Sequence, residues 1–181
     1  NDLSNWGADS VRCNIGGGSI CSTRVQTGHG LPGLQTIMDC AMTDRKAKII
    51  ADGGIRSSGD IVKALAAGAD FVMIGSLLSG TDEAPGEKIK TTKGFVKKYR
   101  GMASADAQMD WRGRTSSEEG ISTHVDYKGP AENILKSLRK GIKSGLSYSG
   151  ARTIEQFQAK AKFVSQTPAG LSESKTHILS R

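Results

Sequence analysis

Short apolar runs alternate with glycine turns and amphipathic segments along the first half of the chain. Residues 10–13 read as a strand that runs into a glycine-rich turn, and residues 48–51 read as a second strand that ends in Asp52-Gly53-Gly54. Between them, apolar residues recur at the spacing of one helical face, in a segment where Pro32 suits the first helical position: Leu34, Ile37, Met38 and Ala41. This pattern predicts a strand, a helix and a second strand.

The next unit repeats the same order. Ser57 and Asp60 resemble a capping box, so a second helix is predicted over 60–67, with Gly68 suited to the position just past its end. Residues 70–74 are predicted to be a third strand, and its continuous apolar character is typical of a parallel strand covered on both faces. Short strand–turn–helix units predict an α/β fold with its function at the carboxyl ends of the strands.

The second half of the chain is patterned differently. Residues 81–127 carry many charges and few aliphatic residues, which predicts a long functional loop or flap. Pro130 is predicted to open a helix whose apolar side is formed by Ile134, Leu135, Leu138 and Ile142. A further helix is predicted to start at Thr153 with Gln156 as its capping partner, and the tail after Thr167 is predicted to be extended.

Length and composition restrict the class of protein. The 181 residues suffice for one domain, 1–181, with a sizeable core, and no apolar run approaches the ~20 residues that span a bilayer. No signal peptide is visible, so we expect a cytoplasmic protein without a membrane partner. The net charge of +7 favours phosphorylated small molecules as partners, and the 5% aromatic content argues against nucleic acid.

The candidate chemistry centres on Cys21. A glycine run directly precedes it, and such a run lets backbone amides approach an anion closely. Two further turns, at 52–54 and 75–76, have the composition of phosphate-binding loops. Cys13 and Cys40 fall in apolar patterns and are predicted to be core residues, because no cysteine spacing suggests a zinc site or a disulfide framework. A thiol beside an anion site suggests an enzyme that holds a nucleotide phosphate and attacks the base.

Five motifs in order resemble the IMP dehydrogenase/GMP reductase family over about residues 7–175: 16–24, 51–55, 73–76, 80–87 and 99–102. The resemblance implies a (β/α)8 TIM barrel, and such a barrel typically needs ~250 residues. The chain therefore resembles the C-terminal half of a barrel, with an active-site flap at about 81–127 and C-terminal helices and tail at about 130–181. The remaining N-terminal half would come from another segment, and a homotetramer is expected.

The resemblance also implies roles for individual residues. Cys21 would form a covalent adduct at purine C2, and Thr23 and Glu119 would protonate the leaving amine, which suits a carboxyl of near-neutral pKa. Asp52 would bind the ribose, and Met102 and Gly120 would lie along the base edge. The 5′-phosphate would be held by Ser19, Gly54, Gly75, Ser76 and Tyr99. Ser104 and Arg114 would contact the cofactor, and carbonyls of Gly16, Gly18 and Cys21 would bind a monovalent cation such as potassium.

The family has two activities, and the segment after Met102 favours one of them. A dehydrogenase oxidises IMP to XMP with NAD and uses an Arg-Tyr pair on its flap, and no Arg-Tyr dipeptide occurs here. The segment 118–122 resembles a reductase, so we expect NADPH-dependent conversion of GMP to IMP and ammonia, with the dehydrogenase as the alternative. Segments 150–154 and 169–174 resemble dehydrogenases instead. Asn14 stands where the family usually has glycine, and Gly17 where proline is common.

Two other classes remain open on the residues alone. The phosphate-type turns at 52–54 and 74–76 also resemble those of flavin-dependent barrel oxidoreductases, although that reading leaves Cys21 without a role. A catalytically silent nucleotide-binding module is the other alternative. Flavin absorbance would favour the first class, and unchanged behaviour of a Cys21→Ala variant would favour the second.

Overall fold

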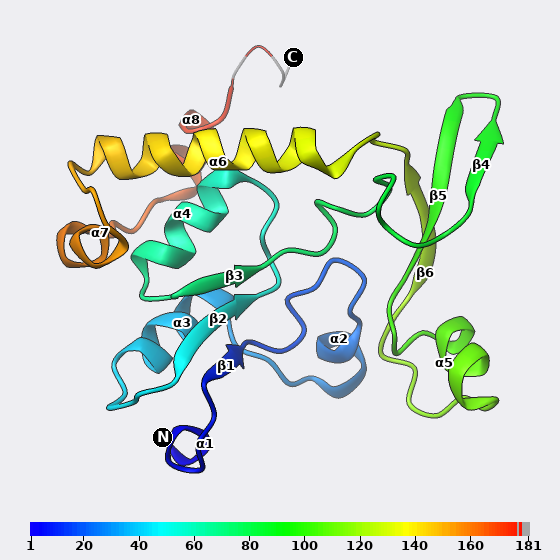
Figure 1. The fold of residues 1–181 in the computed structure, drawn as a ribbon, viewed down its shortest axis with the longest axis horizontal. Helices are drawn as coiled ribbons and strands as arrows, with labels where there is room; N and C mark the ends of the chain where they lie inside the picture. Colours follow the sequence, from blue (N-terminus) through cyan, green and yellow to red (C-terminus); the bar gives the residue numbers. More distant parts are fainter. Residues whose placement is uncertain (177, 179–181) are drawn as a thin grey trace.

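Three parallel strands form the first sheet of this computed structural model, which describes residues 1–176 and 178 (Figure 1). The strands β1 (Ser10–Cys13), β2 (Lys48–Asp52) and β3 (Phe71–Met73) lie in the order β1-β2-β3. The three predicted strands and the α/β class are thus confirmed. Parallel pairing requires a crossover between successive strands, and helices supply it here.

The helices α3 (Gly33–Ala41) and α4 (Ser58–Ala66) make these crossovers. Asp60 N–H donates to Ser57 Oγ at 3.2 Å, and Asp60 Oδ2 accepts from Arg56 N–H and Ser57 Oγ, both at 3.0 Å. This confirms the predicted cap, although α4 begins two residues earlier than expected because Ser57 itself is the N-cap. Pro32 is likewise the N-cap residue of α3 and not its first helical residue.

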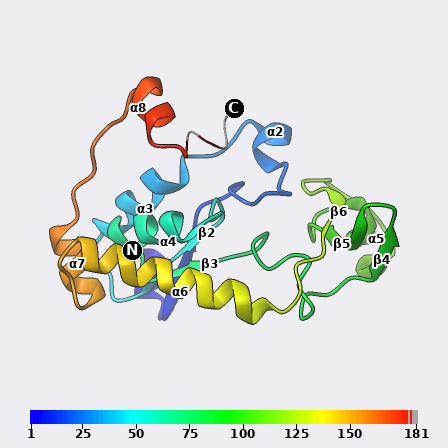
Figure 2. The ribbon, with the colours of Figure 1, turned by 90° about the horizontal axis from the view of Figure 1, so that it is seen from above.

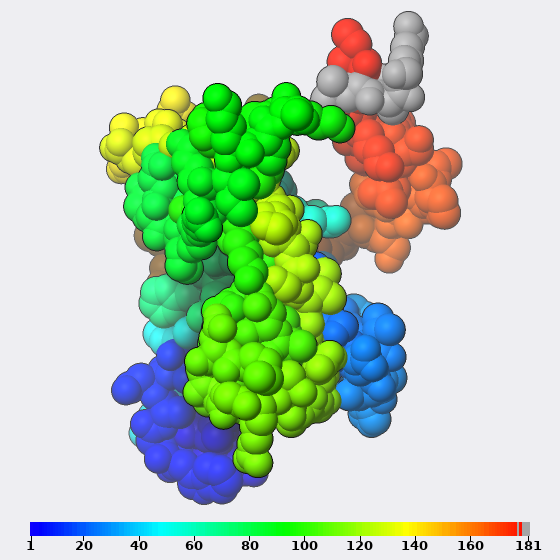
Figure 3. Space-filling view, turned by 90° about the vertical axis from the view of Figure 1, so that its right-hand side faces the viewer, coloured from blue at the N-terminus to red at the C-terminus, as the bar shows by residue number. Residues whose placement is uncertain are grey.

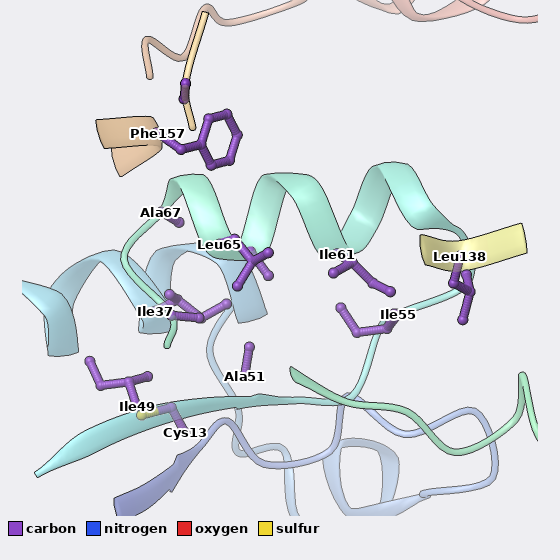
Figure 4. Close-up of a cluster of buried hydrophobic side chains, with 13 residues drawn as sticks. Cys13, Ile37, Ile49, Ala51, Ile55, Ile61, Leu65, Ala67, Leu138 and Phe157 are labelled. Carbon is purple, nitrogen blue, oxygen red and sulfur yellow. The ribbon is translucent and has the colours of Figure 1, made fainter. Parts of the chain in front are cut away.

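The core lies between the sheet and α3 and α4, as Figure 4 shows. Ile49 and Ala51 of β2 are almost completely buried and face Ile37 of α3 and Leu65 of α4. Cys13 is buried here and Cys40 is half-buried against it, so both are core residues as predicted. Burial, with a contribution from neighbouring Cys40, raises the pKa of Cys13 to about 12.

One face of β3 departs from the prediction. Val72 packs against the core, whereas Phe71 is 57% exposed and Met73 is 38% exposed. The expectation of a strand covered on both faces is therefore wrong for the described residues. The physical reason is that, within the described residues, helices pack against only the face of β3 that carries Val72.

The C-terminal helices pack on the outside of this layer. The long helix α6 (Ala131–Tyr148) runs along α4 in both ribbon views (Figure 2), and α7 (Ile154–Lys160) follows it. A Cβ at Gly141 would lie 2.1 Å from Ser58 Oγ, and one at Gly145 would lie 2.6 Å from Val62 Cγ2, so glycine lets the two helices approach closely. Both predicted helices are confirmed.

Outside the predicted flap, three short helices were not predicted: α1 (Asp2–Asn5), α2 (Thr23–Thr27) and α8 (Pro168–Glu173). The predicted extended tail is wrong over α8, because Thr167 caps that helix by accepting the Gly170 N–H at 3.2 Å. Residues 177 and 179–181 of the predicted tail lie outside the described residues. No helix in the described part of the chain has the length and apolar character needed to cross a membrane.

A second sheet occupies the region predicted to be a loop. The strands β4 (Lys88–Thr91), β5 (Gly94–Arg100) and β6 (Ser122–Asp126) are antiparallel, and α5 (Ala105–Arg112) lies between the last two. The loop prediction failed because this sheet has little apolar surface to bury: all of β4 is exposed. Even buried Lys97 is held by a hydrogen bond from its Nζ to the Thr81 carbonyl at 2.8 Å.

Candidate active site

A cavity of about 360 Å³ opens at the carboxyl ends of the parallel strands. Its walls come from the glycine loop after β1, the turns after β2 and β3, and the second sheet with its flanking segments. Figure 3 shows the outer surface of this end of the molecule, where α5 and β6 lie next to the light-blue segment that contains α2. Predicted site residues that line the cavity are Gly18, Ser19, Cys21, Asp52, Gly54, Gly75, Ser76, Tyr99, Met102, Glu119 and Gly120.

Backbone pairing brings Cys21 and Glu119 to the same place. Cys21 forms an isolated antiparallel bridge with Gly120, and the Ser22 N–H donates to the Glu119 carbonyl at 2.9 Å. The Ile121 N–H donates to the Ile20 carbonyl at 3.0 Å. A short two-stranded contact therefore joins the glycine loop to the segment after α5, and the exposed thiol lies at that junction.

The side chains at this junction form a polar chain. Cys21 Sγ lies 3.2 Å from Thr23 Oγ1, and Ser117 Oγ donates to Glu119 Oε1 at 2.9 Å. Hydrogen bonds from Thr23 and then Ser117 lower the pKa of the Glu119 carboxyl below its ordinary value. The expected near-neutral pKa is thus wrong in this structure, because two hydroxyl donors stabilise the ionised form. Thiol, hydroxyl and carboxylate are nevertheless adjacent, which allows a proton to move between them.

Asp52 ends β2 and is held by a residue that was not predicted. Arg12 donates to Asp52 Oδ2 through Nε at 2.9 Å and Nη2 at 2.6 Å. Arg12 pairs with Ile50 in the β1–β2 register, and side chains alternate along a strand, so Arg12 and Asp52 lie on the same face. An arginine between the apolar residues Val11 and Cys13 was the available signal. Both hydrogen bonds use Oδ2, and the carboxylate has a second oxygen for a ligand.

Three of the residues expected at the phosphate, Ser19, Gly75 and Tyr99, lie close together in the cavity lining. Ser19 Oγ and the Tyr99 hydroxyl are 3.3 Å apart, and a Cβ at Gly75 would lie 3.7 Å from that hydroxyl. Lys128, which sequence reasoning missed, donates from Nζ to the Ser76 carbonyl at 2.8 Å and to Leu77 at 3.3 Å. Burial lowers the pKa of Lys128. Its ammonium group lies behind the turn after β3 and adds positive charge to that side of the site.

The family model described as IMP dehydrogenase / GMP reductase domain matches residues 1–177. The chain belongs to this family. The predicted resemblance is therefore confirmed, and the cavity occupies the part of the chain where the family motifs gather.

Similar proteins within the family divide between the two activities. The chain is 47% identical to an inosine-5′-monophosphate dehydrogenase of Nitrosopumilus maritimus (strain SCM1), covering 97% of this chain and 40% of that protein. It is 44% identical to a GMP reductase of Leishmania major, and the match covers 99% of this chain and 39% of that protein. A crystal structure of a cysteine-to-alanine variant of GMP reductase from Trypanosoma brucei, in complex with guanosine 5′-monophosphate, superposes with a TM-score of 0.91 at 45% identity. It covers 97% of this chain and 38% of that one.

Two residues expected at the cofactor do not join the cavity. Ser104 is buried, and its hydroxyl donates to the Gly101 carbonyl at 2.7 Å and accepts the Ala107 N–H at 3.3 Å, so it is the cap of α5. Arg114 is exposed and lies outside the cavity lining. Neither residue lines the cavity, and their contact with a cofactor stays a prediction. The sequence analysis did not predict the helix that Ser104 caps.

The glycine loop also contains the carbonyls that the family resemblance suggests for a monovalent cation. The Gly18 carbonyl accepts the Cys21 N–H at 3.2 Å, and a carbonyl oxygen has a second lone pair for an ion. Gly16 has a φ of +76° and packs against the Arg24 side chain. Within the described residues, no cluster of three or more His, Cys, Asp or Glu side chains could hold a metal ion. The backbone cation site stays a prediction.

Proposed function

We propose that this chain carries the thiol and nucleotide-binding part of a GMP reductase, an oxidoreductase that converts GMP to IMP and ammonia with NADPH. The observation that carries the proposal is the contact of Cys21, Thr23 and Glu119 at the wall of a nucleotide-sized cavity. The GMP bound to the Trypanosoma brucei relative supports a purine nucleotide as substrate. An IMP dehydrogenase that uses NAD is the second candidate, favoured by the 47% identity to the Nitrosopumilus maritimus protein.

The thiol and the acid act in succession in this mechanism. Cys21 gives its thiol proton through Thr23 to the Glu119 carboxylate, and the resulting thiolate adds to purine C2, which forms a C–S bond and moves the electron pair of the ring C=N bond onto nitrogen. Glu119 returns that proton through Thr23 to the exocyclic amine, the electron pair on the ring nitrogen re-forms the C=N bond, and the C–N bond breaks to release ammonia. Hydride from NADPH replaces the lost group at C2, and the thiolate leaves as IMP forms. Ser104 and Arg114, which lie outside the cavity lining, remain the residues proposed to contact the cofactor in that last step.

The remaining cavity residues position the nucleotide. Asp52, oriented by Arg12, accepts hydrogen bonds from the ribose hydroxyls. Met102 and Gly120 bound the base, and a Cβ at Gly120 would lie 2.9 Å from the Ser104 nitrogen, so the backbone there is closely packed. The 5′-phosphate contacts Ser19, Gly54, Gly75, Ser76 and Tyr99, with Lys128 behind them.

The chain spans 38–40% of the length of the three relatives named above. We infer that this chain is the C-terminal half of a (β/α)8 barrel. The three parallel strands with outer helices, and the uncovered face of Phe71 and Met73, support that inference. A homotetramer in the cytoplasm, with a potassium-type cation at the glycine loop, completes the proposal.

The deciding experiment measures both reactions on the full-length protein. The near-ultraviolet absorbance of reduced nicotinamide is followed with GMP plus NADPH and, separately, with IMP plus NAD. Loss of NADPH with release of ammonia supports the reductase. Formation of NADH and XMP from IMP refutes it and establishes the dehydrogenase. Absence of both reactions, with GMP still bound, favours a nucleotide-binding module.

Two variants test the proposed roles. Cys21→Ala removes the nucleophile, so turnover is lost while nucleotide binding persists. Glu119→Gln keeps the size of the side chain but removes the titrating group, so ammonia release falls about 100-fold, the usual scale of acid–base catalysis. Glu118→Gln is the matched control, because that neighbouring carboxylate is exposed. Equal losses in the two glutamate variants would show that only local charge matters.

A further inference from the structure

Asn14 holds a backbone conformation that side chains rarely adopt. Its φ is +93°, and it is the non-glycine residue with positive φ in the described part of the chain. Asparagine tolerates this region better than most residues, but a glycine would adopt it without strain. The Asn14 side chain therefore stands at a position where a glycine would be free of strain, and its contacts indicate what it contributes there.

The Asn14 carboxamide joins three segments around the glycine loop. Its Nδ2 donates to the Asp52 carbonyl at 2.9 Å, and its Oδ1 accepts from Arg24 Nη2 at 2.9 Å. Arg24 also donates to the carbonyls of Ile15 at 3.0 Å and Leu31 at 2.7 Å. The start of the loop, the end of β2 and the helix after Cys21 are thus tied together by one amide and one guanidinium.

Gly17 lies directly against this carboxamide. A Cβ at Gly17 would lie 2.3 Å from Asn14 Nδ2 and 3.5 Å from the Asp52 carbonyl oxygen. The φ of Gly17 lies outside the left-handed region, so its backbone conformation alone does not require glycine. The Asn14 side chain is therefore what excludes a side chain at position 17.

We propose that Asn14 is the positioning residue of the loop that carries Cys21, and that Asn14 and Gly17 act as a coupled pair. The carboxamide occupies the space of a side chain at position 17 and fixes the loop through Arg24 and the Asp52 carbonyl. Thr23 immediately precedes Arg24, so the same clamp sets the 3.2 Å contact between Thr23 and Cys21. The role in turnover rests on the proposed function, whereas the role in placing the thiol does not.

A double-mutant cycle on the full-length protein tests the coupling. Gly17→Ala, Asn14→Gly and the double variant are compared with the parent for the alkylation rate of Cys21 by iodoacetamide, mapped by peptide mass spectrometry. The cysteines Cys13 and Cys40 serve as internal references because they are less exposed. Overpacking by the added methyl is expected to slow alkylation of Cys21 about tenfold in the parent background. In the Asn14→Gly background the same change is expected to have less than about a twofold effect.

Equal effects of Gly17→Ala in both backgrounds would overturn the proposal. Asn14→Asp separates the two contacts, since it keeps the acceptor for Arg24 and removes the donor to the Asp52 carbonyl; we expect it to slow alkylation as well. Where turnover is measurable, kcat should fall with little change in the nucleotide KM, because the loop positions the thiol and not the nucleotide. A parent protein without GMP or IMP turnover would refute the proposed function and leave the alkylation cycle intact.

Discussion

Gly53 and Gly54, which follow β2, differ in their surroundings: a side chain at Gly53 would meet backbone atoms of the glycine loop, and a side chain at Gly54 would point into open space. Gly53 has a φ of +86° and Gly54 a φ of +77°, so alanine is strained at either position by about 1–2 kcal/mol. A Cβ at Gly53 would lie 2.7 Å from the Gly17 carbonyl carbon and 2.9 Å from the Gly18 nitrogen, whereas one at Gly54 would meet nothing within 4 Å. Gly53→Ala therefore adds a steric cost that Gly54→Ala lacks.

The size of that cost follows from what would have to move. The atoms near position 53 are backbone atoms of the loop that leads to Cys21, and they cannot rotate away as a side chain could. Overpacking of this kind costs about 1–3 kcal/mol, so Gly53→Ala should destabilise by about 2–5 kcal/mol and Gly54→Ala by about 1–2 kcal/mol. The difference, about 1–3 kcal/mol, is the steric contribution of the contact between the turn and the loop.

The assay is equilibrium denaturation of parent and both variants, followed by circular dichroism, with the Cys21 alkylation rate as the local measurement. We expect Gly53→Ala to have the lower midpoint and the slower alkylation. Equal loss of unfolding free energy in the two variants would refute the reasoning, because the strain of positive φ would then explain both. The reasoning would also be refuted if alkylation of Cys21 were slowed in Gly54→Ala but not in Gly53→Ala.

Three further predictions follow from particular contacts. Arg12→Gln should raise the dissociation constant for GMP, measured by isothermal titration, only about two- to fivefold. The reason is that the Arg12 side chain is 64% exposed, and an exposed ion pair contributes little. A loss of GMP affinity as large as that of Asp52→Ala would contradict this prediction. Ser104→Ala should lower the unfolding free energy by about 1–2 kcal/mol because it removes the cap of α5. This loss should be larger than that caused by Ser144→Ala, which changes an exposed serine in α6. Burial raises the pKa of Asp70, but the Ile49 N–H, Lys48 and Arg45 outweigh it and lower the pKa overall. The stability from Asp70 is therefore present above the ordinary aspartate pKa of about 3.9 and is lost as the pH falls through the lower folded value. When the unfolding free energy is measured as the pH is lowered, the Asp70→Asn variant should lack the part of the stability loss that comes from protonation of Asp70.

The second sheet was the largest structural error of the sequence analysis. Its strands contain lysines and threonines at positions that face solvent, and buried Lys97 is satisfied by carbonyls instead of being replaced by an apolar residue. Hydrophobic periodicity reports only on surfaces that are buried against apolar partners. The strands of this sheet, which is held together mainly by strand pairing and polar contacts, therefore show no hydrophobic periodicity from which they could be predicted.

Within the site, residues with a local sequence signal were predicted, and residues whose role depends on a partner in space were missed. The glycine run, Cys21, Asp52 and the turn at 75–76 were found from sequence because each carries a local signal of backbone freedom or reactive chemistry. Arg12 and Lys128 were missed because their role depends on which carboxylate or carbonyl lies opposite them. The lowered pKa of Glu119 likewise depends on hydroxyls that reach it only in the folded chain.

Apolar spacing, caps and ordered motifs along the chain were enough to predict the parallel strands, their helices and the family. The pairing of Cys21 with Gly120, the capping role of Ser104 and the contact of Asn14 with Gly17 became visible only in the folded chain. Periodicity and motifs are local in sequence. Hydrogen bonds and steric exclusion depend instead on distances between segments that the chain brings together only on folding.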